Sequence, residues 1–159
     1  MKQKTLSNWL KAIIIGAAAA GTVIYAWIIP SFGQELVSMY PEFLKCFIPW
    51  LTFLIISGIP CYAALVFSWK IAANIGKDLS FSLANAKLLK GMSVLAAADS
   101  AFVFLGNFAL LLLNMNHPSI ILASLFVVLV GIAISALAAV LSHLVRKAAD
   151  LQEQSDLTI

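Results

Sequence analysis

The feature that most constrains this chain is the recurrence of four apolar runs, each about as long as a bilayer is thick. The runs cover residues 12–29, 47–69, 92–113 and 119–141. An α-helix rises about 1.5 Å per residue, so roughly 20 apolar residues cross a hydrocarbon core about 30 Å thick. The runs are too long for strands, and they do not alternate apolar and polar residues. Each run therefore predicts a membrane-spanning helix.

Composition argues against a soluble domain. Of the 159 residues, 62% are hydrophobic and only 11% are charged. Soluble domains are about half apolar and about one quarter charged. A soluble fold of this length could not bury so much apolar surface, and hydrocarbon is the solvent that accepts it. We expect one transmembrane domain over residues 1–159, surrounded by lipid.

The four tryptophans support the limits of the first two spans. Trp9 and Trp27 bracket the first span, and Trp50 and Trp69 bracket the second. At about 1.5 Å per residue the members of each pair lie roughly 27 and 28 Å apart. Indole prefers the headgroup boundary, and two matching separations favour this explanation over random core packing. Trp27 also favours a retained first span over a cleaved signal peptide.

The basic residues lie on alternate sides of the spans. The segment before the first span, the loop 70–91 and the tail 142–159 carry all of them except Lys45. By the positive-inside rule both termini and the loop 70–91 are cytoplasmic, and residues 30–46 form an outer loop. Short connections make neighbouring helices antiparallel. We therefore predict an all-α fold, an integral membrane antiparallel four-helix bundle with cytoplasmic N- and C-termini.

Prolines mark three expected helix limits. Pro30 is expected to stop the first helix because its ring disrupts the backbone hydrogen bonds of a helix interior. Residues 34–40 could form a short helix at the interface, ended by Pro41. Pro118 suits the first turn of the fourth helix, where its missing N–H costs little.

Asp99 is the acidic residue that falls within a span. A charged carboxylate there costs about 2.5–3.5 kcal/mol on insertion scales, so such residues usually face the bundle interior or a wet cavity. Tyr62 and Ser135 lie at a similar depth on other helices, and either hydroxyl could hydrogen-bond the carboxyl. One hypothesis makes Asp99 a buried switch or proton-linked site. The alternatives are an interhelical hydrogen bond that fixes packing, or an acid that reaches the headgroups.

The sequence contains no recognised catalytic or metal-binding motif. His117 and His143 fall at opposite membrane faces in this topology, so they cannot share one site. Cys46 and Cys61 are fifteen positions apart on one predicted helix, roughly 22 Å, which is beyond disulfide reach. We expect neither catalysis nor a metal or cofactor.

Two predicted cytoplasmic segments carry the most patterned sequence. Ser82 is a good N-cap for a helix that enters the third span, and Lys87 lies on a face that reaches the headgroups. Residues 141–151 carry an apolar stripe at helical spacing, so the fourth helix is expected to continue for about three turns beyond the membrane. This extension is either a helix end packed on its neighbours or a docking element for a cytosolic partner.

These segments resemble a known family, the bacterial membrane proteins grouped as domain of unknown function 2975. The resemblance spans nearly the whole chain. Members usually have an acid where this chain has Ala84 and a more acidic run where it has Gln154 and Ser155. The matching features are four spans, Phe81-Ser82, Asn85-Ala86-Lys87-Leu88-Leu89-Lys90 and Leu151-Gln152-Glu153…Asp156-Leu157-Thr158-Ile159.

The resemblance implies a bacterial inner-membrane protein whose gene often lies beside that of a small Cro/CI-like helix-turn-helix regulator. The leading hypothesis is therefore a non-enzymatic sensor, anchor or regulator of such a cytosolic transcription factor, without direct nucleic-acid binding. The runner-up is a small transporter or channel-like carrier that uses Asp99. A third alternative is a purely structural membrane subunit that assembles with another protein. A homo-oligomer is a further possible assembly. The candidate partner contacts are Ser82, Asn85, Lys87, Glu153, Asp156 and Ile159.

Overall fold

The computed structural model describes residues 3–156, with the backbone alone at Asp156, and this part of the chain is all-helical. Four continuous helical stretches are long and apolar enough to cross a membrane: Gln3–Met39, Pro41–Ile75, Leu83–Leu112 and Pro118–Ser155. The prediction of an all-α chain with four helices able to span a membrane is therefore confirmed. The elements are α1 (Gln3–Val23), the π-helical turn η1 (Ile24–Ile28), α2 (Ile29–Met39), the 3₁₀ helix η2 (Pro41–Cys46), α3 (Phe47–Ile75), α4 (Leu83–Leu112) and α5 (Pro118–Asp156).

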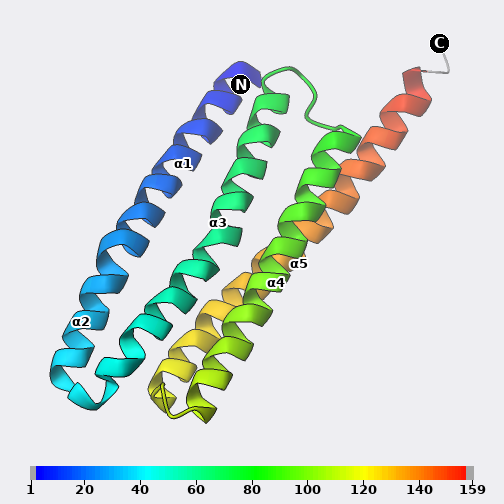
Figure 1. The fold of residues 1–159 in the computed structure, drawn as a ribbon. Helices are drawn as coiled ribbons and strands as arrows, with labels where there is room; N and C mark the ends of the chain where they lie inside the picture. The colour runs from blue at the N-terminus through cyan, green and yellow to red at the C-terminus, as the bar shows by residue number, and fades with distance from the viewer. Residues whose placement is uncertain (1–2, 157–159) are drawn as a thin grey trace.

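The helices form an open row rather than a closed bundle. In Figure 1 the chain descends through α1 and α2, rises through α3, descends through α4 and rises through α5. Each helix packs on the next, in the order α1, α3, α4, α5, and within residues 3–156 the backbone of α5 makes no close contact with α1 or α3. Both ends of the described chain lie at one end of the row, here called the termini end. The opposite end, with η2 and the α4–α5 connection, is called the turn end.

The first helix does not stop at Pro30, so that prediction is wrong. Pro30 occupies the first turn of α2, where a missing N–H is tolerated. The preceding turn widens to π-helical geometry, and the Ile29 N–H bonds the carbonyl of Ile24. This wider turn lets the helix pass a proline that the regular bonding pattern would not accommodate. Most of the expected outer loop 30–46 is consequently helical, in α2 and η2.

Small residues and hydroxyl groups join α4 to α5 along most of their length. Gly131 leaves room for the Ser100 side chain, which a Cβ at this position would overlap. The Ser135 hydroxyl donates to the carbonyl of Ser93 at 2.8 Å. The Ser142 hydroxyl donates to the carbonyl of Ala86 at 2.7 Å. Small side chains and interhelical hydrogen bonds are the usual means of helix association in lipid, where apolar burial gives little driving force.

The other neighbouring helices use similar contacts. At the termini end the buried Ser7 hydroxyl of α1 donates to the carbonyl of Ala72 in α3 at 2.6 Å. Between α3 and α4, the rings of Phe53 and Phe102 lie 5.0 Å apart between centroids. Gly106 permits this packing, because a Cβ there would overlap the Phe53 ring. Each interface thus depends on a few residues matched across two helices.

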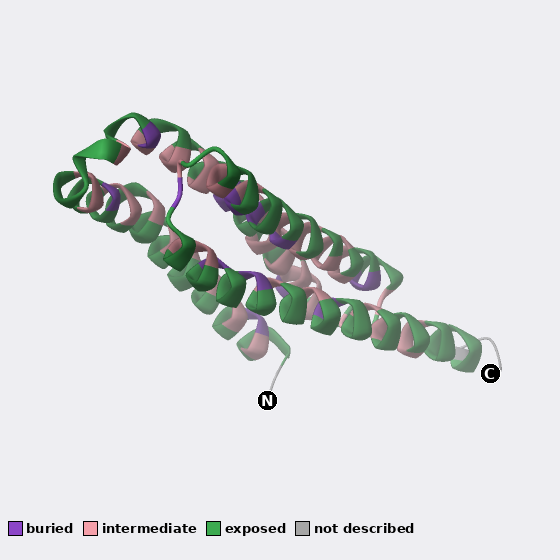
Figure 2. Cartoon of the chain, turned by 90° about the horizontal axis from the view of Figure 1, so that it is seen from below, coloured by how far each residue is buried: buried purple, intermediate pink, exposed green. Residues whose placement is uncertain are grey.

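Most of the molecular surface is apolar and is not covered by other parts of the chain. Figure 2 shows only scattered buried positions along the helices. Trp27 and Phe126 are 70% and 71% exposed, and further exposed large apolar side chains occur along every helix. Soluble monomers rarely expose apolar surface of this extent. Lipid is the solvent that covers such a surface. The chain is therefore a multi-pass membrane protein.

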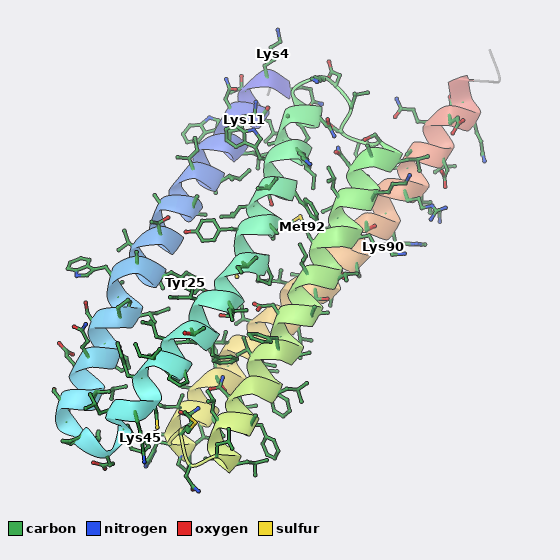
Figure 3. All side chains as sticks on the ribbon, in the orientation of Figure 1. Lys4, Lys11, Tyr25, Lys45, Lys90 and Met92 are labelled. Carbon is green, nitrogen blue, oxygen red and sulfur yellow. The ribbon has the colours of Figure 1, made fainter. Side chains whose placement is uncertain are left out.

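The lysines are distributed unevenly between the two ends. Lys4 and Lys11 lie toward the termini end, whereas Lys45 lies at the turn end (Figure 3). The Lys11 ammonium is 5.4 Å from the ring centroid of Trp69, so it joins α1 to α3 through a cation–π contact. Both cysteines are free, as expected from their spacing.

Candidate functional site

A buried asparagine shapes the loop between α3 and α4 at the termini end. Asn85 is only 1% exposed. Its side-chain amide donates to the carbonyls of Leu79 at 2.9 Å and Ser80 at 3.0 Å. Its side-chain oxygen accepts a hydrogen bond from Asn74 at 2.7 Å. One side chain thus ties the loop backbone to the last turns of α3.

The start of α4 follows from local sequence. Ser82 has an extended backbone, and its hydroxyl accepts a hydrogen bond from the Asn85 N–H at 3.3 Å, so the predicted N-cap is confirmed. Asp78 takes a left-handed backbone conformation, with φ of 61°, which reverses the chain after α3. The loop is therefore a defined structure rather than a loose connection.

The loop and the extended end of α5 line an open, shallow cleft of about 440 Å³, here called the loop–tail cleft. Two segments about 70 positions apart in the sequence meet there. The cleft combines apolar side chains with the carboxylates of Asp78 and Glu153. Leu79 and Phe81 are 52% and 59% exposed although they lie outside the apolar spans. The lining residues are Asp78, Leu79, Phe81, Ser82, Leu83, Ala149, Gln152 and Glu153.

The structure separates the predicted partner contacts. Ser82 and Glu153 both line the loop–tail cleft. Asn85 is buried and holds the loop, so its expected role as a contact residue is replaced by a structural one. Lys87 is exposed on α4 but does not line the cleft. The backbone of α5 ends at Asp156, whose side chain lies outside the described residues, and Ile159 lies outside them entirely.

Asp99 lies in the middle of α4 and is half-buried. Its Oδ2 is 4.0 Å from the Cys61 Sγ of α3, a long and weak thiol contact. Its Oδ1 is buried and has no hydrogen-bond partner among the described residues. A buried polar atom without a partner is uncommon in proteins and calls for an explanation such as a bound water, an ion or a functional role.

The two hydroxyls expected beside Asp99 bond elsewhere. Tyr62 pairs with Thr22 at 2.8 Å and with the carbonyl of Ala18. Ser135 pairs with Ser93 on α4. A similar depth along the helices was therefore not enough to identify the partner of Asp99. Cys61 precedes Tyr62 by one residue, which turns its side chain about 100° around the helix toward α4 instead of α1.

Sequence reasoning missed a second group near Asp99. Tyr25 lies in the π-helical turn, and its ring packs over Gly58 of α3. A Cβ on Gly58 would come within 3.1 Å of the Tyr25 ring. π-Helical turns are frequent at functional sites. Tyr25 of η1 thus packs on α3 one turn before Cys61, and Cys61 in turn contacts Asp99 of α4.

No group of three or more His, Cys, Asp or Glu residues suited to a metal ion occurs within residues 3–156. His117 hydrogen-bonds Ser119 at the turn end, and His143 lies on the α5 segment near the termini end. The two histidines are therefore far apart, as their sequence positions predicted.

These features define a class, the multi-pass helical membrane proteins with polar contacts inside the lipid and a mixed cleft beyond it. Residues 31–159 match the family described as Protein of unknown function (DUF2975), and the chain belongs to that family. It is 26% identical over 162 residues to the uncharacterized membrane protein YoaS of Bacillus subtilis (strain 168), with 99% of each chain covered. No solved structure matches. The family resemblance expected from the sequence is therefore confirmed.

Proposed function

We propose that this protein is a non-enzymatic sensor or anchor of the bacterial inner membrane that binds a cytosolic protein through the loop–tail cleft. The observation that carries the proposal is the meeting of the loop and the α5 extension in one cleft. The excess of lysine and arginine at this end supports a cytoplasmic position for it, and hence for both termini.

The partner proposed is a small helix-turn-helix transcription regulator, which the family resemblance implies. Phe81 is the natural anchor of the contact, because exposed aromatic side chains often supply much of the binding energy at interfaces. Glu153 and Asp78 add negative charge at the edges of the cleft. A regulator would therefore present a basic surface with an apolar centre, and the membrane protein would hold it away from DNA.

Co-purification with a co-expressed small helix-turn-helix regulator, of the kind that the family resemblance implies as a genetic neighbour, tests this proposal. Phe81→Ala and Glu153→Ala should each reduce the amount of regulator retained, and removal of residues 150–159 should abolish retention. Leu151→Ala is the matched control, because Leu151 is 58% exposed on the same helix but does not line the cleft. Equal retention by all four proteins, or no retention by the unaltered chain, would overturn the proposal.

A second candidate function is a small carrier that uses Asp99. The buried, unpaired Oδ1 is the specific observation in its favour, because a carboxylate oxygen without a donor could receive a proton or cation. Proteoliposomes with a pH-sensitive dye inside and an imposed potassium gradient measure proton flux. Flux that disappears in Asp99→Asn supports a carrier. Absence of flux in the unaltered protein, together with a lower unfolding temperature of Asp99→Asn in detergent, supports a packing role instead.

A structural subunit, alone or as a homo-oligomer, is the remaining alternative. It predicts neither regulator retention nor flux, and its homo-oligomeric form also predicts a mass in detergent that exceeds one chain. Light scattering with correction for bound detergent distinguishes one chain from several.

A further inference from the structure

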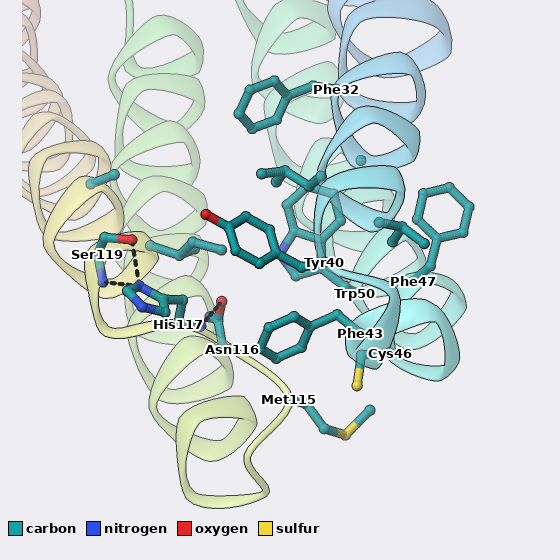
Figure 4. Close-up of a pocket in the computed structure, with 15 residues that line it drawn as sticks. Phe32, Tyr40, Phe43, Cys46, Phe47, Trp50, Met115, Asn116, His117 and Ser119 are labelled. Carbon is teal, nitrogen blue, oxygen red and sulfur yellow. Dashed lines mark hydrogen bonds between the residues drawn. The ribbon is translucent and has the colours of Figure 1, made fainter.

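A second cleft lies at the turn end, between the α2–α3 corner and the start of α5. We call it the aromatic pocket, and its volume is about 460 Å³ (Figure 4). This is within the range of about 300–1,000 Å³ found for small-molecule sites. One wall consists of Phe32, Gly33, Leu36, Val37, Tyr40, Phe43, Cys46, Phe47 and Trp50, and the other of Met115, Asn116, His117, Ser119, Ile120 and Ala123.

Each wall is held in place by contacts of its own. Gly33 is buried, and a Cβ there would come within 2.7 Å of the Phe47 ring and 3.0 Å of Trp50, so α2 packs tightly on α3. On the opposite wall, the buried Asn116 amide donates to the Asn107 side chain at 2.9 Å, which holds the turn against α4. The α5 backbone makes no close contact with α2 or α3 in the described chain. The space between the walls is thus kept open, because each wall is held by its own contacts and the two walls do not pack on each other.

The lining suits a ligand with a long apolar part and one polar end. Aromatic and aliphatic side chains provide most of it. The polar groups gather at the α4–α5 turn, where the His117 Nδ1 lies 2.8 Å from the Ser119 hydroxyl. Tyr40 points its hydroxyl into the same space (Figure 4). Asn116 is already engaged with Asn107 and with the His117 N–H.

We propose that the aromatic pocket binds one acyl chain of a membrane amphiphile, with the polar end of that molecule at His117 and Tyr40. The pocket lies at the end of the membrane-spanning helices, where lipid chains are the abundant apolar molecules. Most of the lining is apolar, so a hydrocarbon chain is a more favourable occupant of this space than water. A single chain segment fits this space, whereas a complete two-chain lipid does not.

This site differs from the ordinary lipid-covered surface because protein encloses the chain from two sides. A chain between two walls makes dispersion contacts on both, so it should exchange more slowly than surface lipid. The inference requires insertion into a membrane but no cytosolic partner. It therefore stands or fails separately from the proposed function.

Fluorescence quenching by brominated chains tests the site, because Trp50 lines the pocket. A variant that retains only Trp50, with phenylalanine at the other three tryptophan positions, is titrated in detergent with brominated phosphatidylcholine or a brominated fatty acid. We expect a saturable loss of Trp50 fluorescence at about one amphiphile per chain. The reagent that saturates at the lower ratio identifies the source of the chain, either a phospholipid or a free fatty acid.

Matched variants separate the pocket from general lipid access. A protein that retains only Trp27, which is 70% exposed, should lose fluorescence gradually and without saturation. Ala123→Phe fills the pocket and should remove the saturable quenching of Trp50. Ala133→Phe makes the same change on an exposed part of α5 outside the pocket and should leave it intact. Gradual quenching of Trp50, or saturable quenching that survives Ala123→Phe, would overturn the inference.

Discussion

Replacing Asn85 with alanine should open the loop at the termini end while the four spans remain in place. The change removes the two bonds to the carbonyls of Leu79 and Ser80 and the bond from Asn74. Each intramolecular hydrogen bond contributes about 1 kcal/mol net, so the loss is about 3 kcal/mol. A change of about 1.4 kcal/mol is tenfold in an equilibrium constant, so loop opening should become about 100-fold more frequent.

Limited proteolysis measures this opening. Lys77 is exposed next to the loop and provides a trypsin site, and mass spectrometry follows the fragment that ends there. When opening and closing are fast relative to cleavage, the cleavage rate follows the population of the open loop. Trypsin treatment in detergent removes any dependence on membrane orientation.

Two further variants calibrate the measurement. Ser82→Ala removes one N-cap bond, typically about 1 kcal/mol, and should raise cleavage about fivefold. Asn8→Ala changes an exposed amide on α1 and should leave the rate unchanged. Cleavage after Lys77 that is equally fast in Asn85→Ala and the unaltered protein would refute the structural role of Asn85.

Other contacts give three further predictions. Gly131→Val should overpack α5 against α4, at a cost of about 1–3 kcal/mol, and so lower the melting temperature in detergent. Gly16→Val is the control, because a Cβ at Gly16 has no atoms within 4 Å, and equal melting temperatures of the two variants would contradict this packing. Asn116→Leu leaves the buried Asn107 oxygen unpaired and should destabilise the protein by about 1–3 kcal/mol in thermal unfolding, an expectation that an unchanged midpoint would exclude. In intact cells an impermeant maleimide should label Glu42→Cys but not Lys147→Cys, in a background without native cysteines, and the reverse pattern would invert the proposed orientation.

Features that depend on neighbouring positions in the chain were predictable from sequence. The four spans follow from apolar runs because the transfer of side chains into lipid is nearly additive along a helix. Ser82 caps α4 and Pro118 begins α5, because caps and first turns involve residues within a few positions of each other. The extension of α5 to Asp156 agrees with its apolar periodicity.

Pro30 shows where a local rule was incomplete. A proline inside a helix was expected to end it, but the π-helical turn before Pro30 shifts the hydrogen bonds and allows the helix to continue as α2. The rule described the missing N–H correctly. It did not include the π-helical turn. The packing of α2 on α3 stabilises this turn, and Gly33 makes that packing possible.

The partner of each polar side chain was decided by tertiary structure. Asp99 meets Cys61 rather than Tyr62 or Ser135, and Asn85 holds the loop rather than facing outward. Membrane insertion could be read from the sequence alone because it depends on the sum of residue hydrophobicities. Both clefts arise where separate helices approach, and the rotation and spacing of those helices depend on contacts between residues distant in the chain, which no local pattern specifies.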